Sequence, residues 1–97
     1  MEFRARQAEV TAAWRRDERT IWRRSGSRMV LLAPEHEQVI VLEDVSALIW
    51  ELLGEPIEQG ELVTLLAGHF EVDPVEVRGQ VEAFLDQLDG FGAARRA

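Results

Sequence analysis

The sequence contains no cysteine, so neither disulfide bonds nor thiolate metal sites are available to it. It has no apolar run close to the roughly 20 residues that a membrane-spanning helix needs. The first ten residues, MEFRARQAEV, hold no apolar segment of the kind that marks a secretory signal. Lysine is also absent, and all 11 basic residues are arginine, a bias that indicates no particular chemistry. These absences predict a soluble, cytoplasmic protein that does not interact with membranes.

What is present is the composition of one globular domain. The 97 residues are 46% hydrophobic and 30% charged, which suits a single modest core. The net charge of −7 is unevenly spread. Residues 1–28 hold eight arginines against four acids, a balance of +4, and residues 29–97 hold three arginines against fourteen acids, a balance of −11. The larger part should therefore repel nucleic acid and attract basic peptides.

Three short β-strands are predicted in the first half of the chain. Thr20–Arg24 carries β-favouring residues, and the turn signal Ser25–Ser27 separates it from the apolar stretch Arg28–Ala33. A break at Pro34–Glu37 precedes a third apolar stretch, Gln38–Leu42. Runs of about five residues between turn clusters are typical of an antiparallel β-meander.

Two helices are predicted next. The first has Asp44 as its N-cap and Gly54 just beyond its end, and its apolar face consists of Val45, Leu48, Ile49, Leu52 and Leu53. The second closes near Gly68 and Phe70, and Gly60 weakens it by up to ~1 kcal/mol. Its apolar face consists of Leu62, Val63, Leu65 and Leu66.

A third helix has the clearest start signal. Asp73 stands at the N-cap, Pro74 at N1 and Glu76 at N3, a variant capping box with Asp in place of Ser or Thr. Gly90 or Gly92 ends the helix. Its apolar face consists of Val77, Val81, Phe84, Leu85 and Leu88.

The predicted fold is α+β: a three-stranded antiparallel β-meander followed by three α-helices. The last two helices, joined by a tight connection, resemble a helix-turn-helix with the sheet as its wing. Residues 19–92 form the expected winged-helix-like domain, and residues 93–97 a short tail. Residues 1–18 are left as an unassigned arm, with an extra strand through Glu9–Trp14 as one alternative.

Catalysis, metal binding and cofactor binding have little support. The two histidines, His36 and His69, fall in a predicted turn and at a helix end. No HExxH or GxSxG pattern occurs. A pairing of His69 with Glu71 or Asp73 is explained better by loop polarity than by a metal or acid–base site. We therefore expect a protein that is not an enzyme.

DNA binding is an alternative that the helix-turn-helix arrangement suggests. The helix that would enter the major groove holds five acids against Arg78 alone, a balance of −4 between Asp73 and Asp89. Such a helix would be repelled by phosphates, whose charge dominates affinity. We therefore expect no nucleic-acid partner.

The third predicted strand is informative, because Val39–Leu42 is a continuous apolar run with no charge or proline. A meander leaves its last strand at an edge, and edge strands normally carry such residues to prevent pairing with other chains. Either the third helix or the N-terminal arm covers this strand, or an extended peptide adds to it by β-augmentation. The three tryptophans (Trp14, Trp22 and Trp50) are better explained by packing than by an aromatic cage.

The segment from Met29 to Gly92 resembles the PqqD family and is similar to the RiPP recognition elements of lasso-peptide and related pathways. The resemblance lies in MVLLAP and QVIVLEDV running into SALIWELLG, then in LVTLLAGHFEVDP and VRGQVEAFLDQLDGFG. Leu42-Glu43 replaces the family's usual Leu-Asn, and Leu53-Gly54 replaces Asp-Gly. These departures leave open which pathway, and which peptide, is served.

The resemblance implies a non-catalytic domain that binds the leader of a ribosomally made precursor peptide as an added strand. The leader would then be presented to a modifying enzyme or protease of the same pathway. Carried over by position, the peptide-binding residues are Val39, Ile40, Val41 and Leu42 on the strand, and Val77, Arg78, Val81, Glu82 and Leu85 on the third helix. An open strand edge also permits a homodimer. A protein-docking adaptor that uses the basic arm is a further alternative.

Overall fold

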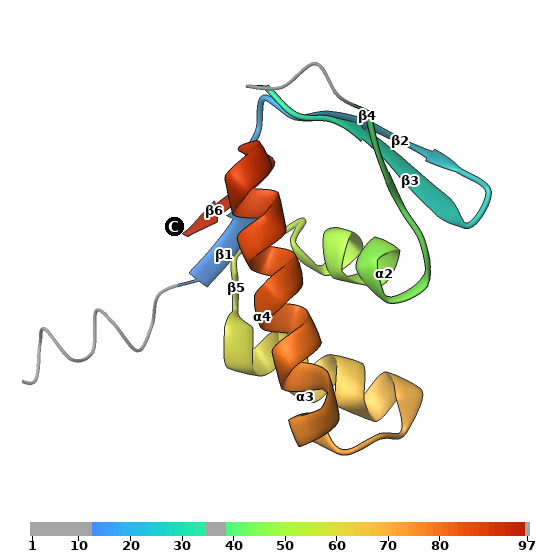
Figure 1. Ribbon diagram of the computed structural model, residues 1–97, viewed down its shortest axis with the longest axis vertical. Coiled ribbons are helices and arrows are strands. Elements are labelled where there is room, and N and C mark those ends of the chain that lie inside the picture. The colour runs from blue at the N-terminus through green and yellow to red at the C-terminus, as the bar shows by residue number, and fades with distance from the viewer. Residues whose placement is uncertain (1–12, 35–38, 97) are drawn as a thin grey trace, which may run out of the picture.

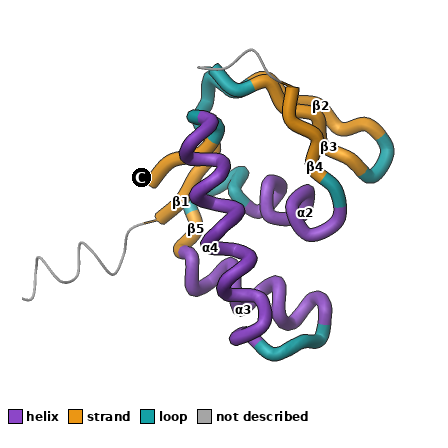
Figure 2. The backbone as a smooth tube through the Cα atoms, in the orientation of Figure 1, coloured by secondary structure: helices purple, strands orange, loops and turns teal. Residues whose placement is uncertain are grey.

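A computed structural model describes residues 13–34 and 39–96 of the chain. Figures 1 and 2 show two separate groups of strands, with one helix between them and another at the bottom of the view, and a long helix that runs from one to the other. The elements are, in chain order, β1 (Ala13–Arg16), β2 (Ile21–Ser25), β3 (Arg28–Leu32), β4 (Val39–Leu42), α2 (Asp44–Leu52), β5 (Ile57–Glu58), α3 (Gln59–Phe70), α4 (Pro74–Phe91) and β6 (Ala94–Arg96).

The predicted meander is confirmed as an antiparallel sheet in the order β2-β3-β4. Gly26, at φ +65°, makes the turn between β2 and β3, a conformation that glycine adopts without steric cost. Side chains alternate between the two faces of the sheet. Met29, Leu31 and Leu42 point inward and are buried, and α2 packs against β3 on that side.

All three predicted helices are present, and the start of α2 differs from the prediction by one residue. Its N-cap is Glu43 rather than Asp44, which takes a left-handed φ of +54°. The Glu43 backbone N–H donates to Ser46 Oγ at 3.1 Å, and the Ser46 hydroxyl donates back to the Glu43 carbonyl at 2.7 Å. The serine hydroxyl, three residues on, therefore fixes where the helix begins. Gly54 follows the C-cap Leu53, as expected.

Helix α4 begins and ends at residues that the sequence indicated. The Asp73 carboxylate accepts a hydrogen bond from the Val75 N–H at 2.9 Å, one residue before the N3 position that a capping box uses. Gly92 ends the helix with φ +77°, and the Ala93 N–H donates to the Leu88 carbonyl. Helix α4 packs against α3, and its core residues are Val77, Val81, Leu85 and Leu88.

A second sheet, in the order β5-β1-β6, joins the two ends of the described chain. Trp14 lies opposite both Ile57 of β5 and Arg96 of β6. Trp14 and Ala94 are buried in the same core as the helices. The packed unit thus extends into the segment 1–18 that the sequence left unassigned and into the expected tail at 93–97.

Arg16, at the end of β1, connects this second sheet to the rest of the molecule. Its Nε donates to the Trp50 carbonyl at 2.9 Å and its Nη2 to the Glu51 carbonyl at 3.3 Å, in the last turn of α2. The guanidinium carbon lies 4.5 Å from the Trp22 ring centre and 5.0 Å from that of Trp50. Burial lowers the pKa of Arg16, and the Glu51 carboxylate opposes that shift. One cation thus satisfies helix carbonyls and contacts two aromatic rings.

Arg16→Met should lower the free energy of unfolding by about 1.5–3 kcal/mol, because two charge-assisted hydrogen bonds to carbonyls are lost. Chemical denaturation monitored by tryptophan fluorescence measures this loss. Arg15→Met is the matched control, since the Arg15 side chain makes an exposed ion pair with Glu18 and no other ion pair within residues 13–34 and 39–96, and it should cost less than about 1 kcal/mol. Equal losses for the two variants would contradict the role given to Arg16.

The Asp17 carboxylate makes the free energy of unfolding depend on pH in the acid range. Arg19 donates to its carboxylate from both the side chain and the backbone, and these hydrogen bonds lower the pKa of Asp17 from 3.8 to about 2. The carboxylate therefore stabilises the fold fully above about pH 4, and that contribution is lost as the pH falls towards 2.

Asp17→Asn should therefore reduce stability at neutral pH and leave less further loss between about pH 4 and pH 2. The expected size is on the order of 1 kcal/mol, because the Arg19 side chain is 64% exposed and solvent screens the pair. Denaturant titrations at a series of pH values give the comparison. Parallel stability curves for the two proteins across that range would exclude this role of Asp17.

Candidate functional site

Strand β4 presents an edge that no described strand covers. It pairs on one side with β3, from Met29 opposite Leu42 to Leu32 opposite Val39, and the sheet ends there within residues 13–34 and 39–96. The four residues of β4 carry no charge and no proline that would block the addition of a further strand. The edge is thus competent to accept an extended peptide.

The side chains of β4 divide between two environments. Val39 and Val41 point outward and are 58% and 52% exposed. Leu42 points inward and is buried, and Ile40 is half-buried against the core. The run Val39–Leu42 is apolar on both faces, but its outer face has no cover among the described residues. Only the inner face packs, and Ile40 is its incompletely covered member.

A groove begins where β4 ends and runs along α4. Its first part is a hollow of about 270 Å³ between the start of α2 and one side of α4, lined by Glu43, Asp44, Val45, Ser46, Ile49, Gln80 and Phe84. Its second part, about 180 Å³, continues towards the α3–α4 turn and is lined by Val45, Phe70, Val72, Glu76, Val77 and Gln80. The two parts share Val45 and Gln80, so they form one continuous surface, which we call the α2–α4 groove.

Half-buried apolar side chains distinguish the groove from the surrounding surface. Val45 and Phe84 pack partly against the core and partly face the opening, as Ile40 does on the strand. The two hollows expose mostly apolar atoms, and their polar lining residues are Gln80 and Glu76 on α4 and Glu43, Asp44 and Ser46 at the start of α2. Partly desolvated apolar pockets with a few polar groups are typical of peptide-binding sites.

The structure separates the α4 residues that the family resemblance assigned to peptide binding. Val77 is 7% exposed and lines the second hollow. Val81 and Leu85 are fully buried in the core, where they support the groove from beneath without lining it. The sequence pattern did not single out Gln80 and Phe84 for the groove. Positions 80 and 84 share one side of a helix, and that spacing is the signal that could have identified them.

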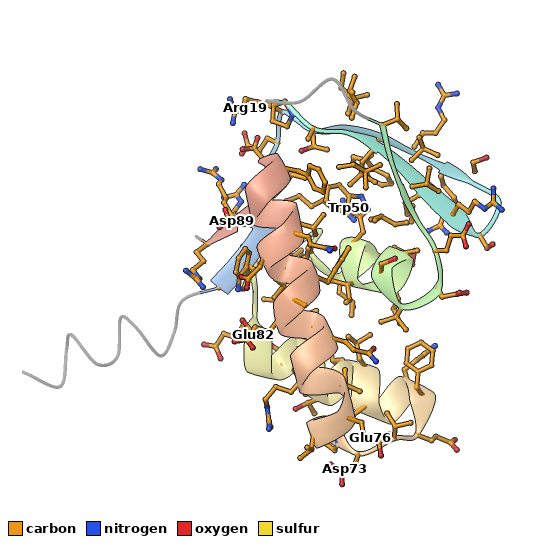
Figure 3. All side chains as sticks on the ribbon, in the orientation of Figure 1. Arg19, Trp50, Asp73, Glu76, Glu82 and Asp89 are labelled. Carbon is orange, nitrogen blue, oxygen red and sulfur yellow. The ribbon has the colours of Figure 1, made fainter. Side chains whose placement is uncertain are left out.

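Arg78 and Glu82 are exposed, and they lie on a different side of α4 from the groove. With 3.6 residues per turn, Glu82 is about 200° around the helix from Gln80. Figure 3 places Glu82 to the left of α4, whereas the sheet that contains β4 lies to the right. These two residues are therefore not brought together with β4 or with the α2–α4 groove.

No cluster of three or more potential metal-ligating side chains occurs among residues 13–34 and 39–96. His69 stacks edge-on against Phe70, with ring centres 4.7 Å apart. His36 falls outside the described residues. In that same part of the chain, none of the helices combines the length and the apolar character needed to cross a membrane.

The comparisons with known proteins agree with this geometry. The fold matches the solution NMR structure of the PqqD truncation of Methylobacterium extorquens PqqCD, described as a functional, stand-alone RiPP recognition element, with a TM-score of 0.71. The identity is 20%, over 87% of this chain and 89% of that one, so this likeness concerns the fold. No curated protein matches the sequence.

The sequence itself matches the family model of coenzyme PQQ synthesis protein D (PqqD) over residues 28–92. This range begins at β3 and ends at the C-cap of α4, so it contains both β4 and the whole α2–α4 groove. It is also about two thirds of the 97 residues. The chain therefore belongs to the PqqD family.

Proposed function

We propose that this chain is a non-catalytic recognition element that binds the leader of a ribosomally made precursor peptide. The leader adds to the edge of β4 as a further strand, and the chain presents it to a modifying enzyme or protease. The observation that carries the proposal is the open, uncharged edge of β4 beside the half-buried apolar groove on α4. Membership of the PqqD family supports it.

Backbone pairing along β4 would fix the register of the leader. An added strand satisfies the free N–H and C=O groups of Val39–Leu42, and every second leader side chain then faces the inner side. Those side chains meet Ile40 on the strand, and the α2–α4 groove receives the residues that follow. The site would therefore favour leaders with apolar side chains at these positions, because burying those side chains contributes to the binding free energy.

The charge of α4 and of the groove lining would favour basic leaders, through carboxylates in the groove and through the field of those outside it. Glu82, Asp86 and Asp89 are exposed on the rest of the helix, and Glu76 lines the second hollow. Their summed field speeds the encounter with a positively charged peptide, and salt screens this effect.

Leader binding would serve the pathway by raising the effective concentration of the precursor peptide at the modifying enzyme. Ordering a disordered leader costs several kcal/mol, so an affinity between micromolar and nanomolar is the expected range. A leader held on this domain keeps its attached core peptide near the active site of a docked enzyme. The chain itself needs no catalytic group for this role.

Ile40→Asp should weaken leader binding at least about tenfold, because it places a charge at the half-buried inner position of the edge strand. Isothermal titration calorimetry against synthetic leaders of precursor peptides encoded beside the gene gives the affinity. Val41→Asp should cost less, since the Val41 side chain points to the opposite face. Val75→Asp, which changes an exposed valine at the start of α4, is the control for the added charge.

Circular dichroism spectra and melting temperatures establish that each variant is folded. If Ile40→Asp and Val41→Asp both remain folded and bind the leader normally, the leader does not add to this edge. If no leader from the neighbourhood of the gene binds the wild-type chain, the leader-binding function itself is wrong.

Phe84→Ala tests which side of α4 lines the site. Removing a half-buried ring from the groove should cost about 1–2 kcal/mol of binding free energy, a five- to thirtyfold loss of leader affinity. Glu82→Ala, on the other side of the helix, should change affinity less than about threefold, and that change should vanish at 0.5 M salt. A larger, salt-resistant loss for Glu82→Ala would place the leader on the opposite side of α4.

A further inference from the structure

The sheet β2-β3-β4 has an outer face that no described element covers. Figure 1 shows α2 beneath the inner side of this sheet and no helix over the other side. By strand register, Ile21, Leu32 and Val39 form one row across the outer face, and Arg23, Val30 and Val41 form the next. We call these six residues the outer face.

The outer face is apolar and exposed to an unusual degree. Ile21 is 68% exposed, Val39 58%, Val41 52% and Leu32 37%. A shallow hollow of about 300 Å³ lies over the first row, with Ile21, Arg23, Val30, Leu32 and Val39 among the residues that line it. A contiguous cluster of exposed aliphatic side chains on one side of a sheet commonly marks a protein–protein contact.

The charge of this face is opposite to that of α4. Arg23 lies within the second row, and Arg28 follows at the hairpin end, where it pairs with Glu43 at 2.7 Å. The six residues of the outer face include no acid, although the net charge of the chain is −7. A partner whose apolar patch is bordered by carboxylates fits this face.

A second copy of the chain fits less well. Face-to-face packing would bring two Arg23 side chains into one interface without an acidic partner from either face. The outer face also has only six residues, whereas each partner contributes roughly 20–30 to a stable interface. A partner that covers only this face would therefore bind weakly.

A leader strand added to β4 would enlarge this same surface. In an extended strand every second side chain points to the outer side, next to Val39 and Val41. The outer face and the bound leader then form one continuous surface, and a partner that spans both buries more area than either offers alone.

We infer that the outer face, together with the bound leader, is the docking surface for the modifying enzyme or protease. The enzyme carries an apolar patch with an acidic border and binds the leader-loaded chain more tightly than the empty one. Only the tighter binding of the leader-loaded chain rests on the proposed leader binding. Docking through Ile21 and Arg23 can be measured independently.

The test measures binding of the enzyme or protease encoded beside the gene to immobilised full-length chain, with and without saturating leader. Ile21→Glu should weaken enzyme binding at least tenfold, because it buries a carboxylate against an apolar, acid-bordered patch. Arg23→Glu should weaken it mainly at low salt. Val75→Glu is the matched control, since Val75 is 70% exposed and lies on α4, and it should leave enzyme binding unchanged.

Each variant is also titrated with the leader alone, to which Ile21→Glu should bind as the wild type does. Equal enzyme binding by Ile21→Glu and Val75→Glu would overturn the inference. It would also be overturned by a concentration-dependent dimer, seen by sedimentation, that Ile21→Glu abolishes, because the occupant would then be a second copy. If enzyme binding depends on Ile21 but no leader binds, the proposed function fails and the docking surface remains.

Discussion

The Arg16 guanidinium is the contact that joins the two sheets to helix α2. It donates to the carbonyls of Trp50 and Glu51 at the end of α2, and it lies over the rings of Trp22 from β2 and Trp50 from α2. Trp22 and Trp50 also meet edge-to-face, with ring centres 6.1 Å apart. Figure 3 shows Trp50 between the sheet β2-β3-β4 and α2. A cation that satisfies helix carbonyls and two aromatic faces together couples these elements more firmly than apolar packing alone.

The shape of the α2–α4 groove depends on where α2 lies. The chain passes from β4 to α2 through Glu43, whose backbone exchanges hydrogen bonds with Ser46. The position of α2 under the sheet therefore sets the angle at which the β4 edge approaches α4. The end of α2 is held by Arg16 and its beginning by the Glu43–Ser46 contact, and the α2–α4 groove opens between this helix and α4.

The fold was largely predictable because its signals are local. The turn at Gly26, the N-cap Asp73 and the C-cap Gly92 each depend on a few neighbouring residues, and the structure confirms them. The second sheet could not be predicted in the same way. Strand β1 pairs with β6 about 80 residues later, and both are short segments rich in arginine, with no alternation of apolar residues to mark them.

The candidate site was predictable on the strand and only partly on the helix. An uncharged run at the end of a meander already identifies an open edge, as in Val39–Leu42. An apolar stripe on a helix indicates which side is buried, but not which residues lie at the margin of the core. Val81 and Leu85 belong to that stripe and are fully buried. Phe84 belongs to it too, but it is only partly buried and lines the groove together with the polar Gln80.

The pairing of β1 with β6 also determines how this unit can be joined to other polypeptides. Trp14 lies opposite Arg96, so the chain enters and leaves the described fold at neighbouring points. Figure 1 shows this junction on the side of α4 away from the sheet β2-β3-β4. A unit with adjoining ends can be inserted into a surface loop of a larger host without separating the two sides of that loop. In such an insertion the unit would be attached to the host through β1 and β6, and the β4 edge would stay accessible on the other side of α4.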